Sequence, residues 1–264
     1  MGSLHIFKVS VLNRWKSTLI WSLSLFGMAI LFAALFQSFS SEIDKLADSY
    51  PESLQAFVGD INAAATPAGW LGIELYSLMV PFSLAIIGAG FGSSALGKEE
   101  DSGTLELLLA SPVSRERILF EKALAIGLVL AVVAMSVWLG VAIGTLLFSF
   151  DVSLVDTFWA TAMSWILGMF FAFVTLAVQA MSGRRSLALG VGSALLAATY
   201  MLDVVSKLLE SLDFLKYFSP FYYSSPPTVL LEGINIANFV GLVLAVGVLY
   251  FIAHIFFNKR DTGV

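Results

Sequence analysis

The segment that decides the fold is Gly97–Lys122, GKEEDSGTLELLLASPVSRERILFEK, which interrupts a mostly apolar chain. It carries four basic and six acidic residues. One charge-free segment runs up to it (75–97) and another runs away from it (123–150). About 20 apolar residues suffice to cross a bilayer, so this pattern predicts a polar loop between two membrane-spanning helices.

The composition extends this interpretation to the whole chain. Of its 264 residues, 58% are hydrophobic and 12% are charged, with a mean hydropathy of +0.89. Soluble domains carry about 25% charged residues, so the apolar excess is expected to face lipid. The net charge of −5, without a basic cluster, argues against nucleic acid as a partner. The lack of cysteine excludes disulfides and thiol chemistry.

Six charge-free intervals predict six transmembrane helices, the fifth of them at the lower length limit with 17 residues. The predicted fold class is an all-α integral membrane protein, with a single transmembrane domain over residues 1–264. The spans are expected at about 18–37, 72–96, 123–148, 157–181, 186–204 and 236–257.

Lysine and arginine set the expected orientation. With both termini on one side, that side receives 11 of the 14 basic residues and the other side receives 3. Positive charge accumulates in cytoplasmic loops, so both termini and the 97–122 loop are predicted to be cytoplasmic in a plasma membrane. No N-x-[ST] acceptor occurs, which fits a bacterial or archaeal protein.

Three segments are expected to have particular shapes. Leu4–Trp15 places apolar residues at helical spacing and predicts a helix in the headgroup plane, with a frayed terminus as the alternative. Pro81 predicts a kink in the second span. The segment 203–235 has an apolar helical pattern over 204–215, followed by SPFYYSSPP (219–227). It predicts an interfacial or re-entrant hairpin before the last span.

The fourth span is rich in Met and aromatic residues. They could line a path for an apolar or amphipathic substrate, or they could simply pack against other helices and lipid. The residues concerned are Met163, Trp165, Met169, Phe170, Phe171 and Phe173.

Two glycine patterns at the end of the second span imitate nucleotide-binding motifs. Residues 92–98 fit a phosphate loop until its last position, where Glu99 replaces the required Ser or Thr, and residues 90–95 fit a dinucleotide fingerprint. Both motifs need a preceding strand in a βαβ unit, whereas a membrane helix precedes them here. We interpret the glycines as helix-packing positions, together with those at 88, 140 and 144, and expect no nucleotide on this chain.

The sequence offers little for catalysis. Its two histidines, His5 and His254, lie near the predicted cytoplasmic face, and neither belongs to a group with metal-ligand spacing. No serine sits in a nucleophile-elbow pattern. The spans are also almost free of ionisable residues, which disfavours a transporter driven by its own ion site. We therefore expect a non-enzymatic chain whose energy arrives from a partner.

Within the loop, Asp101 or Ser102 can cap a helix over 104–111, Pro112 ends it, and Ser114 caps the helix that leads into the third span. Four leucines within five positions, 105 and 107–109, cannot all be covered by a short loop. They are expected either to dip into the headgroup region or to enter a groove of a partner protein.

The residues of this loop resemble a known family. EDSGTLELLLASPVSR (100–115), followed by Ile118 and the Glu121–Lys122 pair, closely resembles the loop between the second and third helices of ATP-binding-cassette type-2 permeases. The resemblance covers almost the full chain and implies a type V exporter-like fold. The 104–111 helix would correspond to the family's coupling helix and Leu4–Trp15 to its connecting helix.

The resemblance also implies partners and a site. Two permeases, identical or paralogous, would pair in the lipid bilayer, and each would dock a separate ABC ATPase. ATP and Mg would bind to that ATPase, with no cofactor on this chain. A hydrophobic or amphipathic substrate is expected, at residues that the sequence does not identify. The ATPase-coupling residues implied are Gly103, Thr104, Leu105, Glu106, Leu107, Leu108, Leu109, Pro112, Val113, Ser114 and Arg115.

Two other functions fit the same pattern. The first is an ATPase-linked mechanical, membrane-remodelling, resistance or sensing complex without classical transport. The second is a membrane facilitator or assembly factor that needs no ATPase.

Overall fold

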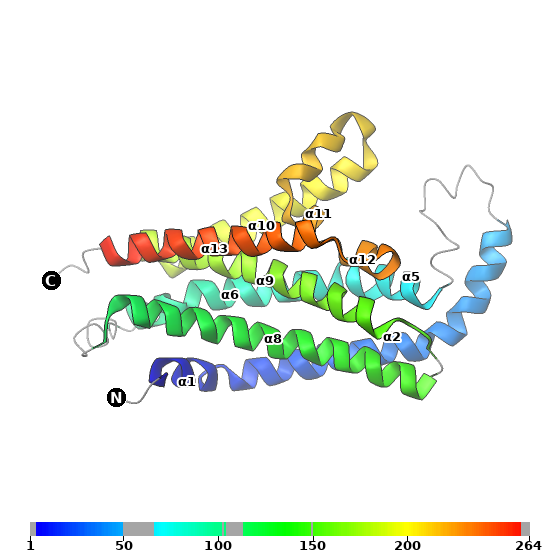
Figure 1. Cartoon of the computed structure of the whole chain (residues 1–264), viewed down its shortest axis with the longest axis horizontal. Helices are drawn as coiled ribbons and strands as arrows, with labels where there is room; N and C mark the ends of the chain where they lie inside the picture. The colour runs from blue at the N-terminus through cyan, green and yellow to red at the C-terminus, as the bar shows by residue number, and fades with distance from the viewer. Residues whose placement is uncertain (1–3, 50–65, 102, 104–112, 149, 260–264) are drawn as a thin grey trace.

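The protein is a bundle of long helices that run along one common direction (Figure 1). The computed structural model describes residues 4–49, 66–101, 103, 113–148 and 150–259, and every regular element within these residues is helical. In chain order the elements are α1 (His5–Leu12), α2 (Trp15–Ser49), α5 (Pro67–Leu71), the π-helix η1 (Gly72–Tyr76), α6 (Met79–Asp101), α8 (Arg115–Phe148), α9 (Leu154–Ser182), α10 (Arg185–Leu208), the 3-10 helix η2 (Glu210–Phe218), α11 (Pro220–Ser224), α12 (Pro226–Glu232) and α13 (Ile236–Lys259).

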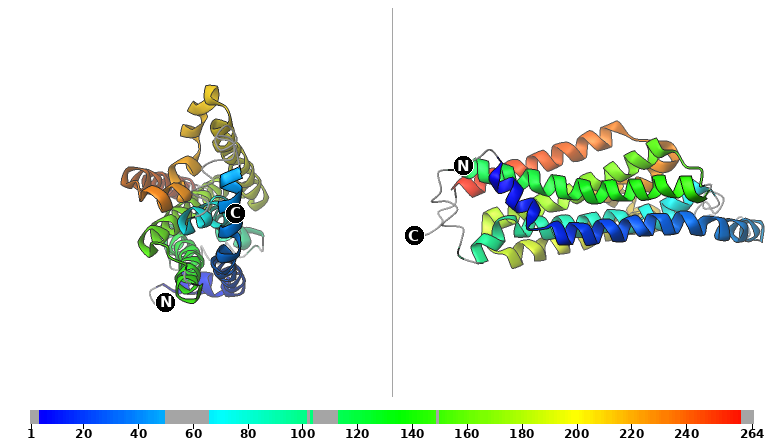
Figure 2. Two further views of the ribbon diagram at one scale, coloured as in Figure 1. Left: turned by 90° about the vertical axis from the view of Figure 1, so that its right-hand side faces the viewer. Right: turned by 90° about the horizontal axis from the view of Figure 1, so that it is seen from below.

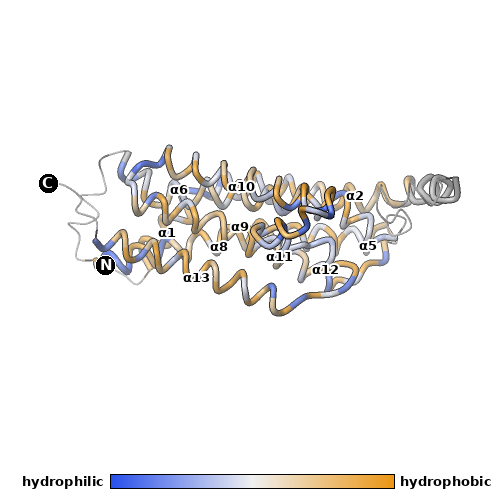
Figure 3. The backbone as a smooth tube through the Cα atoms, turned by 90° about the horizontal axis from the view of Figure 1, so that it is seen from above, coloured by the Kyte–Doolittle hydropathy of each residue, from blue (hydrophilic) through white to orange (hydrophobic). Residues whose placement is uncertain are grey.

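Six helical segments are long and apolar enough to cross a membrane, which confirms the predicted fold class. They are Trp15–Phe36, Pro67–Gly97, Arg115–Phe148, Leu154–Ser182, Arg185–Leu208 and Ile236–Lys259. Apolar residues cover their middle parts, and hydrophilic ones gather where the chain leaves the bundle (Figure 3). The two ends of the chain lie at one end of the bundle (Figure 1), which we call the charged end because the charged roots of the 97–122 loop lie there.

Helix α9 is the centre of the bundle. In its apolar window 78% of residues are buried, against 11% for α13 and 17% for α2. Its buried hydroxyls are satisfied within the helix: Ser164 donates to the Ala160 carbonyl, and Thr175 donates to the Phe171 carbonyl. Thr161 also meets the hydroxyl of Tyr76 at 2.6 Å. These hydroxyls therefore cost little in the apolar core, because each has a partner within the protein.

Small residues let α6 and α9 touch backbone to backbone. A Cβ atom on Gly92 would lie 1.9 Å from the Ala172 carbonyl oxygen, and one on Gly88 would lie 2.2 Å from that of Gly168. On α8, Gly140 and Gly144 take the same role against Phe26, Ala29 and Ala33 of α2. The structure thus confirms the predicted packing role of these glycines, which suits helix association in lipid because there packing replaces the hydrophobic effect.

The predicted interruption near Pro81 is present. The π-helix η1 ends at Tyr76, a turn at Ser77–Leu78 follows, and α6 begins at Met79. Proline has no N–H to offer the carbonyl four residues earlier, which is that of Ser77, so the helix changes form at this point.

The segment 204–215 does not form the single helix that its apolar pattern predicts. Helix α10 continues through it only to Leu208, Leu209 is extended, and η2 then runs to Phe218. The turn allows the Ser219 hydroxyl to donate to the Thr199 carbonyl at 2.8 Å and brings Phe221 against Phe82. These tertiary contacts outweigh the local periodicity. The segment projects from the bundle before α11, α12 and α13 return along it (Figure 1).

The N-terminal helix is shorter than predicted. Helix α1 ends at Leu12, the chain turns at Asn13–Arg14, and α2 starts at Trp15. Seen from below, α1 departs from the direction of α2 and lies beside the start of α8 (Figure 2). Its place in a headgroup plane stays a prediction.

Candidate functional site

The structure describes the two roots of the predicted coupling loop. The helix expected over 104–111, with Thr104, Leu105, Glu106, Leu107, Leu108, Leu109 and Pro112 of the proposed site, lies outside the described residues. Gly103 is exposed with φ +66°, and its N–H donates to the Glu100 carbonyl at 3.1 Å beyond the end of α6. This left-handed backbone favours glycine. On the other side, Ser114 caps α8 as predicted, since its hydroxyl accepts from the Arg117 N–H at 3.3 Å.

The first turn of α8 is attached to the last turns of α13. Arg115 follows the cap and donates through Nη1 to the Phe257 carbonyl at 3.3 Å. One residue later, the Glu116 carboxylate lies 3.6 Å from Nε2 of His254. Of the residues predicted to couple to an ATPase, Ser114 and Arg115 therefore stand at a junction of two membrane helices.

The second turn of α8 is attached to α1. Glu121 is 1% exposed, and its carboxylate binds two groups. Oε1 accepts from Arg117 Nε at 2.8 Å, and Oε2 accepts from the backbone N–H of Phe7 at 3.0 Å. A buried carboxylate that accepts a charge-assisted bond and a backbone N–H fixes the N-terminal helix to the root of the loop.

Lys122 attaches the same turn to α6. Its ammonium is 4% exposed, forms an ion pair with Oε1 of Glu99 at 2.5 Å, and donates to the Ala95 carbonyl. Glu100, the next residue of α6, accepts from Nε2 of Gln179 near the end of α9. Adjacent residues Glu121 and Lys122 thus bind different neighbours, and the root of the loop is joined to four helices.

Arg14 secures the turn between α1 and α2. Its Nη2 donates to the Ser94 hydroxyl at 2.6 Å and to the Phe91 carbonyl at 3.3 Å, and its guanidinium lies 4.2 Å from the centre of the Phe91 ring. Burial lowers the pKa of Arg14 to about 10, against an opposing effect from Glu99, so the group stays charged at neutral pH. Arg14 belongs to the segment predicted to lie in the headgroup plane, and its contacts with α6 leave it half-buried.

The glycine patterns near this site belong to a helix. Residues 90–98 lie within α6, where Gly92 packs on α9 and a Cβ on Gly97 would lie 2.8 Å from Cβ of Arg185. Their role in packing is confirmed at these two glycines. Among the described residues there is no group of three or more His, Cys, Asp or Glu side chains that could hold a metal ion.

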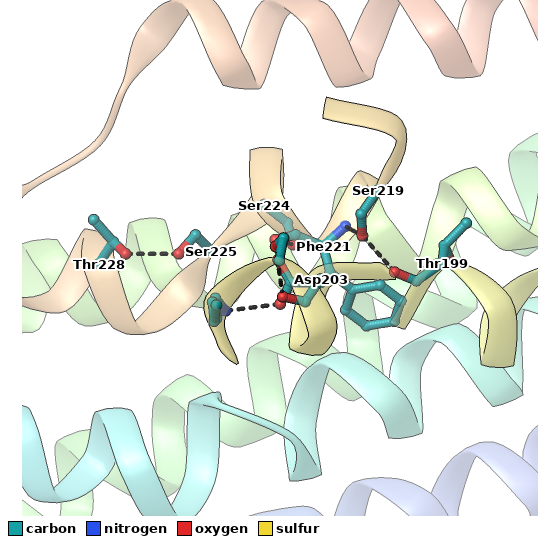
Figure 4. A network of polar contacts seen from close by, with 9 residues as sticks. Thr199, Asp203, Ser219, Phe221, Ser224, Ser225 and Thr228 are labelled. Carbon is teal, nitrogen blue, oxygen red and sulfur yellow. Dashed lines mark hydrogen bonds and ion pairs between the residues drawn. The ribbon is translucent and has the colours of Figure 1, made fainter. Parts of the chain in front are cut away.

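A second polar cluster lies where α10, α11 and α12 come together (Figure 4). Asp203 is 5% exposed on α10, pairs with Lys207 at 2.7 Å, and its carbonyl accepts from Ser206. The Ser219 hydroxyl bridges the Thr199 carbonyl and the N–H of Phe221. The bond from Ser219 to Thr199 fastens the projecting segment to α10, whereas the contacts of Asp203 lie within α10.

The aromatic and Met residues of α9 divide between two environments. Met163 and Phe171 are 1% exposed or less and belong to the core. Trp165, Met169 and Phe173 line an apolar groove of about 610 Å³ beside α8. Met169 and Phe173 are also buried, at 9% and 4% exposed, so they reach the groove only at its floor, and Trp165 is the more exposed member of the lining.

Comparison with known proteins agrees with this arrangement. Residues 4–262 match the model of the ABC-2 family transporter protein. The chain is also 27% identical over 199 residues, 72% of its length and 71% of the relative's, to the probable ABC transporter permease protein NosY of Stutzerimonas stutzeri. Six apolar helices are long enough to cross a membrane, and several of them are joined at the roots of a polar loop. The chain belongs to the ABC-2 transporter family and is a permease of the ABC transporter type.

Proposed function

We propose that this permease is the membrane subunit of an exporter and that a separate ABC ATPase, which holds ATP and Mg, docks on the 97–122 loop. The observation that carries the proposal is the bracing of the loop's second root. Within eight residues of α8, Arg115, Glu121 and Lys122 bind α13, α1 and α6 respectively. A displacement of the loop would therefore move four helices together.

The chemistry of the braces supports a mechanical role. Lys122 and Glu121 are almost fully buried, and removing the partner of a buried charge is strongly destabilising. The Lys122–Glu99 ion pair and the bond from the Phe7 N–H to Glu121 are the contacts that would transmit a push from the loop. The apolar leucines 105 and 107–109 would give the ATPase its docking surface, with the loop's charges around them.

The proposal includes an orientation and an assembly. The charged end would face the cytoplasm of a bacterial or archaeal cell, with both termini there, because 11 of 14 basic residues belong to that side. Two permeases, identical or paralogous, would form the transporter. A hydrophobic or amphipathic substrate fits the apolar spans.

Co-purification and transport test the proposal. The permease and its Leu107→Asp variant are each co-expressed with the candidate ATPase, and the amounts of ATPase that co-purify are compared. Burial of a leucine contributes about 1.5–3 kcal/mol, so affinity is expected to fall about tenfold or more. Leu209→Asp, at an exposed leucine beyond α10, is the matched control and should leave assembly intact. Normal assembly of Leu107→Asp would contradict the docking surface.

Proteoliposomes then test transport. ATP-dependent movement of a substrate out of the compartment that holds the ATPase is the expected result. Assembly and ATP hydrolysis without movement would favour a mechanical or sensing complex instead, and failure to associate with any ATPase would favour a facilitator or an assembly factor.

A further inference from the structure

An apolar groove follows the outside of the bundle between α8 and α13. Helix α13 packs on α9 and touches α8 little, so α9 forms the floor between them. Trp165, Met169 and Phe173 line this floor, and Leu124, Leu128 and Tyr250 line the sides. We call this surface the α8–α13 groove. The Trp165 indole donates to the Gly127 carbonyl at 3.2 Å, which ties the floor to α8.

The length of the groove corresponds to one leaflet of a bilayer. Along α8 it runs from Phe120 to Ala131. At about 1.5 Å per residue this distance is roughly 16 Å. Half of the hydrocarbon core of a bilayer is about 15 Å thick. The groove therefore begins at the charged end and ends near the mid-plane of the membrane. An acyl chain of a lipid in that leaflet covers the same depth.

At the charged end the groove opens into a smaller, partly polar pocket of about 450 Å³. Phe120 and Tyr250 line both spaces, so the two adjoin. Arg117, Glu116 and His254 line the polar part. The side chain of Arg117 is 46% exposed and uses its Nε for Glu121, while the described residues give its terminal nitrogens no acceptor. Glu116, which lies against His254, is 69% exposed.

We propose that the α8–α13 groove binds one phospholipid of the leaflet at the charged end, with one acyl chain on the α9 floor. The terminal nitrogens of Arg117 bind the phosphate, and Glu116 binds the ammonium of an ethanolamine headgroup. A neighbouring cation and anion match the phosphate and the amine of that headgroup, whereas phosphatidylglycerol offers Glu116 only neutral hydroxyls and no cation. The site goes beyond the proposed export function and stands without it.

A photoactivatable phosphatidylethanolamine, with a diazirine near the methyl end of one chain, tests the site. The full-length protein is labelled in nanodiscs and the labelled peptides are mapped. Labelling is expected to concentrate on 124–131 and 165–173. Excess unlabelled phosphatidylethanolamine should reduce it, and the same excess of phosphatidylglycerol should reduce it less.

Two substitutions fill the groove. A Cβ on Gly127 lies 3.4 Å from Met169, so Gly127→Phe projects into the groove without a backbone clash. Leu124→Trp fills the groove from a second position on α8. Both should abolish groove labelling. The matched controls are Gly247→Phe, where a Cβ has no neighbour within 4 Å, and Leu244→Trp, which is 64% exposed on α13. Both controls should label as the wild type does, and equal thermal unfolding confirms folding.

The headgroup contacts have their own variants. Arg117→Gln should lower labelling severalfold and remove the preference for ethanolamine, while Arg184→Gln, at an exposed arginine of the same end, should change neither. Labelling no stronger in the groove than on the exposed face of α10, or unchanged in Gly127→Phe and Leu124→Trp, would overturn the proposal. Because the chain has no cysteine, a cysteine placed at Leu128 is the only one that can form a disulfide. A disulfide between two copies through this position would also overturn the proposal, because a second copy and not a lipid would then cover the groove.

Discussion

Lys122 of α8 and Glu99 of α6 form an ion pair at 2.5 Å beneath the 97–122 loop, with the lysine 4% and the carboxylate 31% exposed. The two residues lie near opposite ends of this loop in the sequence. Their pairing closes the loop at its base and joins the end of the second membrane helix to the start of the third.

The two partners of this pair should respond unequally to substitution. Glu99→Gln leaves the buried ammonium of Lys122 without its counter-charge and is expected to destabilise the protein by about 3–5 kcal/mol. Lys122→Met removes the more buried charge and keeps the packing, so it should cost less. Thermal unfolding of both variants in detergent measures the difference. A greater loss with Lys122→Met would contradict the assignment of Lys122 as the more costly charge.

Glu121 should matter for energy transfer more than for assembly. Glu121→Gln weakens the attachment of α1 and of Arg117 but leaves the loop's leucines unchanged. With the candidate ATPase, the variant complex should form and hydrolyse ATP while transporting less substrate per ATP. Glu210→Gln, on an exposed carboxylate of η2, serves as the control. Unchanged coupling in Glu121→Gln would remove α1 from the path of transmission.

Arg14 should be irreplaceable by lysine. Arg14→Lys keeps the charge but loses the planar group that reaches Ser94, the Phe91 carbonyl and the Phe91 ring together. Hydrogen bonds from a charged group contribute about 1.5–3 kcal/mol, so the loss of stability is expected in that range. Lys8→Ala, on an exposed basic residue of α1, should have little effect. Equal unfolding temperatures for Arg14→Lys and the wild type would contradict this role.

Neighbouring glycines of α6 should differ sharply. Gly92→Ala places a methyl group 1.9 Å from the Ala172 carbonyl oxygen, so α6 and α9 must separate, at a cost of about 1–3 kcal/mol or more. Gly90→Ala meets no atom within 4 Å and should be tolerated or slightly stabilising, since alanine favours helices. Yield of folded protein and its unfolding temperature report both. Similar behaviour of the two variants would show that α6 does not pack on α9 through this face.

Much of the fold was predictable from local patterns. The charge-free intervals predicted six membrane helices because a segment inside lipid has to be free of charged residues, whatever the rest of the fold does. Small residues four apart predicted the packing faces at Gly88, Gly92, Gly140 and Gly144. The 204–215 segment was wrongly predicted as one helix, because periodicity does not reveal that Ser219 bonds to Thr199 across a turn.

The sequence by itself determined that this chain spans a membrane and that the third membrane helix, α8, starts after a cap at Ser114. It also determined that a charged loop with an apolar centre lies between the second and third membrane helices. These are local properties, set by solvation and by neighbours a few residues apart. Only the tertiary structure decided that Glu121 turns to α1, Lys122 to α6 and Arg14 into the protein. Such choices depend on which helices the packing brings together, because a buried charge must find its partner wherever the fold supplies one.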